Sequence, residues 1–248
     1  MNADNNGGTL GVGSSCEDRI DTRYVGFCDI LGFSNRILSD FDRTREVYEQ
    51  FGDLLSSVPA AEGVEITIYS DAVLVTGQSL IRVAQAVQNL SFIALVHNLM
   101  LRGAITKGRY WERRQGNHML VASDALARAV KLERIVSIPA VVIADDVEIP
   151  IEVWLSRFVN GPYLTPILHF RDRNIVNPFS ITWGTSAGDR ASQLMAESPA
   201  HKDKYLWFLS LYQAVKNGQE LVPPDVLARF IREGILKAKI DPNHPDVT

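Results

Sequence analysis

Two aspartates stand at the ends of short apolar runs, and their positions favour a metal-ion site. Asp29 lies near the end of a run that starts at Tyr24, and Asp71 lies in the short interval between two further runs. Carboxylate oxygens are ligands that Mg²⁺ and Mn²⁺ prefer, and a site with few protein ligands leaves positions open for phosphate oxygens. Such a pair suits phosphoryl or nucleotidyl transfer. Taken singly, Asp29 fits a helix cap and Asp71 fits a simple turn residue.

The elements around these aspartates follow the order β, α, β, β, α, β, α. The expected strands are Tyr24–Ile30, Val64–Ile68, Ala72–Val75, Leu101–Gly108 and Gly116–Val121. The expected helices cover the region from Ile37 to Leu55, the segment from the Ser79 cap to near Met100, and Ser123–Arg134. This order predicts an α+β fold, a split βαβ sheet with helices on one face. Asp29 and Asp71 would then meet at adjacent strand ends.

The chain divides into three expected parts. Residues 1–21 are rich in Gly, Asn and Ser and are predicted to be a flexible leader. Residues 22–145 form the expected catalytic core, and residues 146–248 form a mixed C-terminal extension packed on it. The extension is expected to hold a strand over Tyr163–Phe170 and helices over Gly188–Ala196, His201–Lys216 and Pro224–Leu236. The charged segment Glu112–Arg114 is interpreted as an exposed turn.

Composition excludes several classes of protein. The net charge of −4 gives no basic surface for nucleic acid. Cys16 and Cys28 do not suggest a disulfide framework, and the five histidines show no zinc-ligand spacing. No signal peptide or membrane-spanning run is found, so we predict a cytoplasmic protein that does not bind membranes.

Four segments resemble the class III adenylate and guanylate cyclases. Phe27–Ser34 resembles the first metal motif of that family, and Tyr69–Leu74 resembles the second. Leu101–Gly108 resembles the next core strand, and Ser123–Glu133 resembles the helix that carries the transition-state residues. The resemblance implies a ferredoxin-like cyclase core in which Asp29, the Ile30 carbonyl and Asp71 hold two ions of Mn²⁺ or Mg²⁺. The backbone that leads into the first helix is expected to bind the phosphates through Ile30, Leu31, Gly32, Phe33 and Ser34.

Departures from the family pattern bear on the substrate. The Lys and Asp that read a purine base in this family fall on Thr67 and Leu120, which argues against ATP and GTP. The transition-state Asn and Arg of the family fall on Ala127 and Lys131. Lys131, from this chain or an opposite protomer, is expected to stabilise phosphate charge, although it lacks the bidentate geometry of arginine.

The altered pattern resembles the bacterial Pycsar pyrimidine cyclases. That resemblance implies a homodimer, UTP or CTP as substrate, and an effector protein that responds to the cyclic nucleotide in antiphage defence. Between the two products we favour cyclic UMP over cyclic CMP. A nucleotide-binding module without turnover stays open as an alternative. A cyclic-dinucleotide synthase is disfavoured, because its Gly-Gly-acidic turn is absent at residues 69–71.

Three further side chains are candidates for the base or phosphate pocket. Arg102 begins an apolar strand beside the proposed site, where a guanidinium can bind a base carbonyl or a phosphate. A surface charge at a strand end explains Arg102 equally well. Tyr48 on a helix and Tyr69 beside the hairpin turn are also predicted to line the pocket, with ordinary packing as the alternative.

Overall fold

The computed structural model describes residues 20–57, 61–136, 138–180 and 186–237. Strands lie at β1 Asp21–Ile30, β2 Val64–Tyr69, β3 Ala72–Gly77, β4 Leu101–Gln115, β5 His118–Ser123, β6 Val141–Ile143, β7 Ile167–Phe170 and β8 Arg173–Val176. Helices lie at α1 Phe33–Ser39, α2 Phe41–Ser57, α3 Leu80–Val96, α4 Asp124–Val136, α5 Ile151–Asn160, α6 Ala187–Glu197, α7 Lys202–Lys216 and α8 Pro224–Arg232, with the short 3₁₀ helix η1 at Pro199–His201. Residues 1–19 of the predicted leader lie outside the described residues. The first strand was predicted to begin at Tyr24, and in the structure β1 begins three residues earlier, at Asp21.

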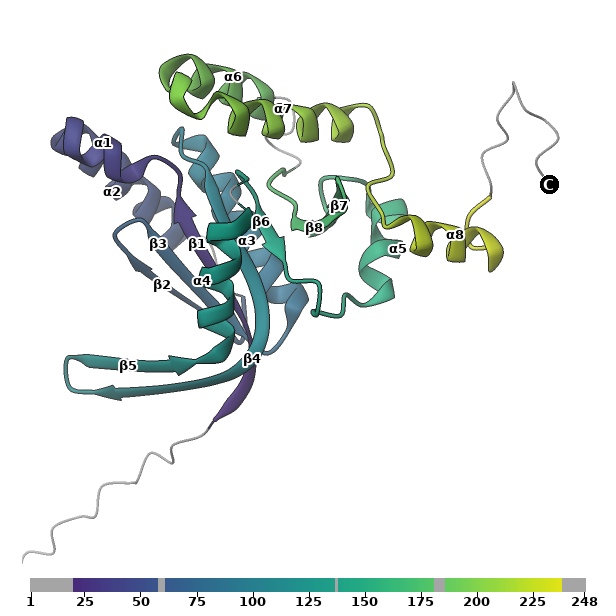
Figure 1. Cartoon of the computed structure of the whole chain (residues 1–248), viewed down its shortest axis with the longest axis horizontal. Coiled ribbons are helices and arrows are strands. Elements are labelled where there is room, and N and C mark those ends of the chain that lie inside the picture. The colour runs from purple at the N-terminus through teal and green to yellow at the C-terminus, as the bar shows by residue number, and fades with distance from the viewer. Residues whose placement is uncertain (1–19, 58–60, 137, 181–185, 238–248) are drawn as a thin grey trace, which may run out of the picture.

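The strands form one sheet in the order β2-β3-β1-β4-β6-β8-β7, with β5 paired to the outer part of β4 (Figure 1). β1 is antiparallel to both of its neighbours, and its register places Asp29 opposite Ala72 on β3 and Arg102 on β4. β6 is parallel to β4, as a crossover through α4 requires. The central position of β1 therefore brings three separate segments of the chain to Asp29.

Helices cover both faces of the sheet. α3 packs on the face of Gly26 and Ile105, where Val87 lies 3.5 Å from the position that a Cβ on Gly26 would take. α4 packs on the other face, where the Thr106 hydroxyl donates to the Ala125 carbonyl at 2.7 Å. Ile105 and Thr106 are consecutive, so their side chains point to opposite faces. The predicted α+β class and element order are confirmed, whereas the prediction of helices on one face is wrong, because α4 covers the face opposite α3.

The α3 helix begins as predicted and ends early. Ser79 is its N-cap, and its side chain accepts a hydrogen bond from an amide in the first turn. The predicted end near Met100 is wrong, since α3 stops at Val96. Asn98 has a φ of 57°, and the Leu99 amide donates back to the helix at 2.8 Å, which is a left-handed C-cap. The early end leaves room for the chain to turn into β4.

The β4–β5 hairpin extends from the sheet as an arm (Figure 1). The predicted turn at Glu112–Arg114 is wrong, because these residues continue β4 to Gln115. The chain turns instead at Gly116, whose φ of 55° is a conformation that glycine adopts without a Cβ clash. Charged residues are compatible with this strand because Arg113 and Arg114 are exposed and the less exposed Glu112 is paired with Arg114.

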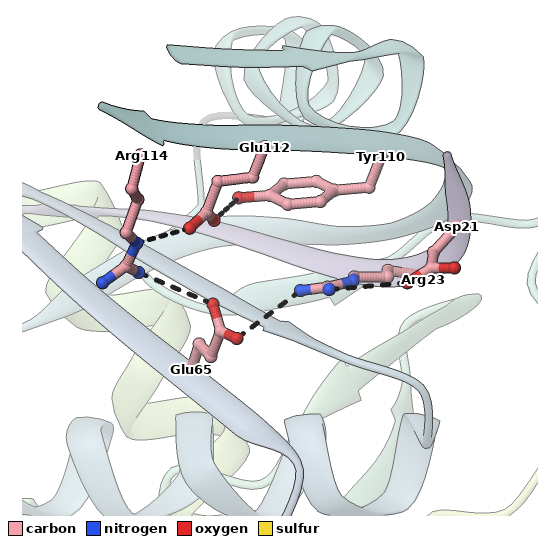
Figure 2. A network of polar contacts seen from close by, with 6 residues as sticks. All are labelled: Asp21, Arg23, Glu65, Tyr110, Glu112 and Arg114. Carbon is pink, nitrogen blue, oxygen red and sulfur yellow. Dashed lines mark hydrogen bonds and ion pairs between the residues drawn. The ribbon is translucent and has the colours of Figure 1, made fainter. Parts of the chain in front are cut away.

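A polar network ties the arm to β1 and β2 (Figure 2). Glu112 accepts hydrogen bonds from the Tyr110 hydroxyl at 3.1 Å and from Arg114 Nε at 2.6 Å. Glu65 on β2 lies 3.8 Å from Arg114 and 3.8 Å from Arg23. Burial and the neighbouring Glu112 raise the pKa of Tyr110 to about 12. This network lies at the start of β1, the end of the strand opposite Asp29, so it stabilises the scaffold and not the candidate site.

The C-terminal region continues the same sheet. β8 pairs with β6, and β7 forms the edge beyond it. The fully buried Asn177 holds this part together by donating to the Pro162 and Thr165 carbonyls at 2.6 and 2.8 Å and by accepting from the Phe179 amide at 3.0 Å. A buried amide with its donors and acceptor used is stabilising, whereas an unsatisfied one is costly.

The bounds of the C-terminal elements follow the prediction in part. The strand expected over Tyr163–Phe170 starts at Ile167, and α5 and β8 were not predicted. α6 and α7 lie within one residue of the expected bounds at each end. α8 ends at Arg232, and Gly234 follows it with a φ of 72°. Within the described residues, none of the helices has the length and hydropathy needed to span a bilayer.

The thiol of Cys28 is expected to be inert in the native protein. Its side chain is fully buried, and burial together with the nearby Asp29 and Glu133 raises its pKa to about 12. Thiolate is the reactive form, so alkylation requires opening of the sheet. In a Cys16→Ser variant, we expect iodoacetamide to label no thiol at neutral or mildly alkaline pH and one thiol in concentrated guanidinium. Rapid labelling of the native variant would contradict this packing.

Candidate active site

Asp29 and Asp71 come together at the ends of two paired strands. Asp71 is the second residue of the Ser70–Asp71 turn between β2 and β3, and Ser70 has a φ of 55° that tightens this turn. The Ile30 amide donates to the Asp71 carbonyl at 2.9 Å, so the backbones beside the two carboxylates are bonded directly. The Ser34 hydroxyl donates to Asp71 Oδ2 at 3.0 Å. The hairpin and the end of β1 thus hold the two acidic side chains near each other.

The carboxylate of Asp29 is partly buried, and this burial is the main influence on its pKa. Burial raises its pKa, and the negative charge of Asp71 raises it further, while the hydrogen bond and positive charge of Arg102 act in the opposite direction. The net result is a raised pKa. Two carboxylates that repel each other in a partly desolvated place are stabilised by a cation between or beside them.

Arg102 supplies a cation to Asp29 in this structure. Its guanidinium lies 2.8 Å from Asp29 Oδ2, and its Nε lies 3.0 Å from Oε1 of Glu133 on α4. Glu133 is 6% exposed, and its Oε1 accepts no hydrogen bond from the described residues. The 3.0 Å ion pair with Arg102 supplies the charge partner that a buried carboxylate needs. Arg102 therefore has two acidic partners, and it would stay paired with Glu133 if it separated from Asp29.

The donor set fits divalent cations of the Mg²⁺ and Mn²⁺ kind. Asp29 and Asp71 offer hard oxygen ligands, and the position beside Asp29 already favours positive charge. Within the described residues no group of three or more His, Cys, Asp and Glu side chains could hold a metal ion. Zinc and calcium sites need more protein ligands than two carboxylates, whereas Mg²⁺ is commonly held by one or two carboxylates plus substrate phosphates.

The loop from Ile30 to Ser34 lies beside the acidic pair, and part of its hydrogen-bonding capacity is already used. The amides of Ile30 and Leu31 donate to the carbonyls of Asp71 and Met100. Gly32 has a φ of 75° and starts α1 without a side-chain cap. Among the described residues, the amides of Gly32, Phe33 and Ser34 have no hydrogen-bond partner, so these three are left for an anion in the predicted phosphate cradle.

A cavity of about 740 Å³ adjoins this loop. Gly32, Phe33 and Tyr48 line it from the core, and α6, η1 and α7 line it from the C-terminal region. The Tyr48 hydroxyl donates to the Ser70 carbonyl at 2.5 Å, so this wall of the cavity touches the hairpin turn that carries Asp71. Asp29 and Asp71 themselves do not line the cavity. The cavity is large enough for a nucleotide-sized ligand beside the acidic pair.

Two other predicted site residues, Thr67 and Tyr69, lie on β2. Thr67 and Tyr69 lie on the face of the sheet that carries Asp29, since the registers run Thr67–Leu74–Phe27 and Tyr69–Ala72–Asp29 across the strands. Tyr69 is 83% exposed.

Two of the predicted site residues lie apart from the aspartates within the chain. Leu120 is exposed on β5, where it pairs with Arg113 in the arm. Lys131 is exposed on α4, two residues from both Ala129 and Glu133, which are buried. Positions two apart on a helix point in nearly opposite directions, so Lys131 faces away from the sheet. The structure therefore does not bring Leu120 or Lys131 to Asp29 and Asp71 of the same chain.

Three residues near the site were not found by sequence reasoning. Glu133 ends the segment Ser123–Glu133 and pairs with Arg102, which no pattern in the sequence indicates. His201 lies against the loop at Gly32, and Lys204 acts electrostatically on Asp29. No local sequence signal marks His201 or Lys204, because their proximity depends on how α6 and α7 pack.

Comparison with known proteins gives structural likeness alone. No family model and no curated protein matches the chain. The chain is similar to a bacterial light-regulated adenylyl cyclase, at 16% identity over 52% of this chain and 44% of that one, with a TM-score of 0.41. It is also similar to the guanylyl cyclase Cya2, at 9% identity over 64% of this chain and 92% of that one, with a TM-score of 0.44. A third similar structure is the adenylyl cyclase CyaB from P. aeruginosa, at 16% identity over 64% of this chain and 94% of that one, also with a TM-score of 0.44. The chain thus spans less than half of the light-regulated enzyme. At these identities and TM-scores the likeness says nothing of substrate.

Proposed function

We propose that this chain is a nucleotidyl cyclase that converts UTP into 3′,5′-cyclic UMP and pyrophosphate with two divalent cations. The observation that carries the proposal is the meeting of Asp29 and Asp71 at neighbouring strand ends, where the Ile30 amide donates to the Asp71 carbonyl at 2.9 Å. Burial raises the pKa of Asp29 and the charge of Asp71 adds to this, while the larger effect of Arg102 opposes it, so a cation already stabilises this carboxylate. A nucleotide-sized cavity adjoins the same loop.

In the proposed reaction the ribose 3′ hydroxyl gives up its proton to solvent, and its oxygen forms a bond to the α-phosphorus. The bond from that phosphorus to the bridging oxygen breaks, and its electron pair leaves with pyrophosphate. Asp29, Asp71 and the Ile30 carbonyl would hold Mn²⁺ or Mg²⁺, which lowers the pKa of the 3′ hydroxyl and offsets phosphate charge when bound. Ser34 orients the Asp71 carboxylate through its 3.0 Å hydrogen bond. The amides of Gly32 and Phe33 are proposed to donate to phosphate oxygens.

Arg102 is proposed to change partner during this cycle. It neutralises Asp29 in the structure, and Glu133 gives it a second partner at 3.0 Å. Released from Asp29, the guanidinium would be free to contact a base carbonyl or a phosphate. Glu133 keeps it close to the site in both arrangements.

The pyrimidine assignment rests on the residues that stand where the resembling family reads purines. Thr67 and Leu120 offer no cation or carboxylate for a purine edge. Tyr48 and Tyr69 are proposed to line the base pocket with Arg102. UTP is our choice and CTP is the alternative.

The biological setting is proposed by the same resemblance. We infer a cytoplasmic homodimer in which Lys131 of one protomer reaches the site of the other, since Lys131 faces away from its own sheet. The cyclic nucleotide would act on a separate effector protein in bacterial antiphage defence. Residues 22–145 are proposed as the catalytic core and residues 146–248 as the extension, with β8 joining the two through β6.

Incubation with each of the four ribonucleoside triphosphates and Mn²⁺ tests the activity. We expect cyclic UMP and pyrophosphate in equal amounts from UTP, and less product from CTP, ATP and GTP, as measured by chromatography and mass. A larger yield from CTP would reassign the base, and a cyclic dinucleotide would reassign the class. If the folded protein converted none of the four triphosphates, the enzymatic proposal would be wrong.

A nucleotide-binding module without turnover is the second candidate. The observation that favours it is the ion pair between Arg102 and Asp29, which competes with a metal ion for the same carboxylate. Lys131 is also turned away from the site. Mn²⁺-dependent binding of UTP by calorimetry, with no product after prolonged incubation, would support this candidate over the enzyme.

A further inference from the structure

The cavity of about 740 Å³ has walls from two distant parts of the chain. Residues of α1, α2 and the turn after α3 line it from the core, while the end of α6 and η1 line it from the C-terminal region. α6 and α7 lie beyond the end of the sheet where β1 leads into α1 (Figure 1). Because Asp29 and Asp71 do not belong to the lining, the cavity is a separate space beside the acidic pair.

Arg36 on α1 is held in the wall of this cavity by a hydrogen bond to the backbone. Its side chain is partly buried, and its Nη1 donates to the Asn98 carbonyl at 3.1 Å. The Asn98 side chain accepts from Arg190 Nη1 on α6 at 3.1 Å, so Asn98 connects the two walls. Arg36 makes no ion pair with a carboxylate of the described residues. The position of its guanidinium is therefore fixed, while its charge has no acidic partner.

Arg43 lines the same cavity from the first turn of α2. Its side chain is exposed, and its guanidinium makes no hydrogen bond or ion pair with the described part of the chain. Two acidic residues also line the cavity, and each has another contact. Asp40 Oδ1 accepts from the Arg43 backbone amide at 3.2 Å, and Glu197 Oε1 accepts from Gln193 at 2.9 Å. The cavity thus presents two guanidinium groups that no described carboxylate pairs with.

Two guanidinium groups in one wall favour an anionic ligand. A guanidinium is planar, and its fork of donors matches the oxygens of a phosphate group. The rings of Phe33 and Tyr48 belong to the same lining, with their centroids 5.2 Å apart, so the cavity has an aromatic wall as well as its cations. A volume of about 740 Å³ is that of a pocket for a small organic molecule and exceeds what an inorganic ion needs. An organic phosphate of nucleotide size suits both parts of the lining.

We propose that this cavity binds the phosphate groups of an organic phosphate through Arg36 and Arg43. Two sources supply that chemistry: the terminal phosphates of the proposed triphosphate substrate, and a separate nucleotide bound beside the active site. Only the first source rests on the proposed function. In both cases the C-terminal region has a role, because α6 and η1 complete the wall of the cavity.

The test uses the full chain, with inorganic pyrophosphate as the probe and EDTA in the buffer. Without divalent ions the carboxylates of the acidic pair repel the probe, so binding reports on the arginines. Calorimetric titration compares the wild type with Arg36→Gln and Arg43→Gln. The matched control is Arg45→Gln, since Arg45 is exposed on α2, pairs with Glu49 at 2.6 Å and does not line the cavity. We expect each cavity variant to weaken binding about 10-fold or more, as loss of a charge-assisted contact does, and the control to bind like the wild type.

Two outcomes would overturn the inference. One is a wild-type protein that does not bind pyrophosphate, and the other is equal affinity in the wild type and all three variants. If Arg36→Gln lowers the melting temperature, Arg43→Gln decides, because the Arg43 guanidinium makes no contact with a described residue that the fold would lose. Weaker binding by Arg43→Gln with a normal melting temperature supports the site, and unchanged binding contradicts it.

A second titration separates the two sources of the phosphate. It uses the α,β-methylene analogue of UTP, which cannot release pyrophosphate, with Mn²⁺ present. Weaker binding of the analogue by Arg43→Gln assigns the cavity to the terminal phosphates of the substrate, and unchanged binding assigns it to a separate organic phosphate. The UTP assay keeps the two proposals apart. Pyrophosphate binding that depends on Arg43, without a cyclic product, defeats the proposed function alone, while cyclic UMP from a protein that does not bind pyrophosphate defeats the inference alone.

Discussion

Replacing Asp71 with asparagine is expected to reduce cyclic nucleotide formation about 1,000-fold. The amide keeps the shape of the side chain and can still accept from Ser34, but it removes the charge that holds a divalent ion. Metal ions contribute several kcal/mol to such reactions, and each ~1.4 kcal/mol is a factor of ten in rate. The Asp71 carbonyl that accepts from Ile30 belongs to the backbone and is unchanged. The fold should therefore survive while activity is lost.

Rates of product formation with Mn²⁺ and thermal melting monitored by circular dichroism check this prediction together. Asp53→Asn is the matched control, because Asp53 is exposed on α2 and lies outside the proposed site. We expect wild-type rates from the control and wild-type melting from both variants. A loss smaller than about 10-fold in Asp71→Asn would mean that this carboxylate is not a metal ligand.

Replacing Gly103 with alanine is expected to destabilise the fold by about 3 kcal/mol or more. A Cβ at this position on β4 would lie 2.3 Å from the Phe27 carbonyl oxygen and 2.8 Å from Cys28 Cα, both of which are backbone atoms of β1. Neither can rotate away as a side chain would, so the two central strands must separate. Overpacking in a core costs 1–3 kcal/mol and occasionally more, against a total stability of about 5–15 kcal/mol.

Gly52→Ala provides a control in which the stability of the fold is expected to rise instead of fall. Gly52 lies within α2, and a Cβ there would meet no atom within 4 Å. Alanine is favoured over glycine in a helix by about 0.5–1 kcal/mol, so this variant should be slightly more stable than the wild type. Urea unfolding monitored by circular dichroism measures both changes. A Gly103→Ala protein with wild-type stability would show that β1 and β4 are spaced more widely than the structure has them.

The candidate site divides into residues that a sequence pattern reveals and residues that it does not. Asp29 and Asp71 follow apolar strand runs, and antiparallel pairing of those runs brings their ends together. Arg102 is predictable as a site residue because it lies at the start of the next strand, and the register places it opposite Asp29. Glu133 lies on the crossover helix, and its contact with Arg102 depends on which face of the sheet α4 covers.

Errors in the predicted elements have local physical causes. The early end of α3 depends on the left-handed conformation of Asn98. Asparagine tolerates this conformation, but its presence in a sequence does not predict it. The charged segment Glu112–Arg114 was interpreted as a turn, because charge usually indicates exposure. In the structure Arg113 and Arg114 are exposed and still belong to a strand, and Arg114 pairs with Glu65 on β2.

The order of strands and helices, the two acidic strand ends and the likeness of four segments to a cyclase core came from the sequence alone, because periodicity and turn residues act over short distances along the chain. The contact of His201 with Gly32, the approach of Lys204 to Asp29 and the outward direction of Lys131 were decided by tertiary structure. These depend on packing between elements far apart in sequence, where burial of apolar faces, and not any local pattern, determines which side chains meet.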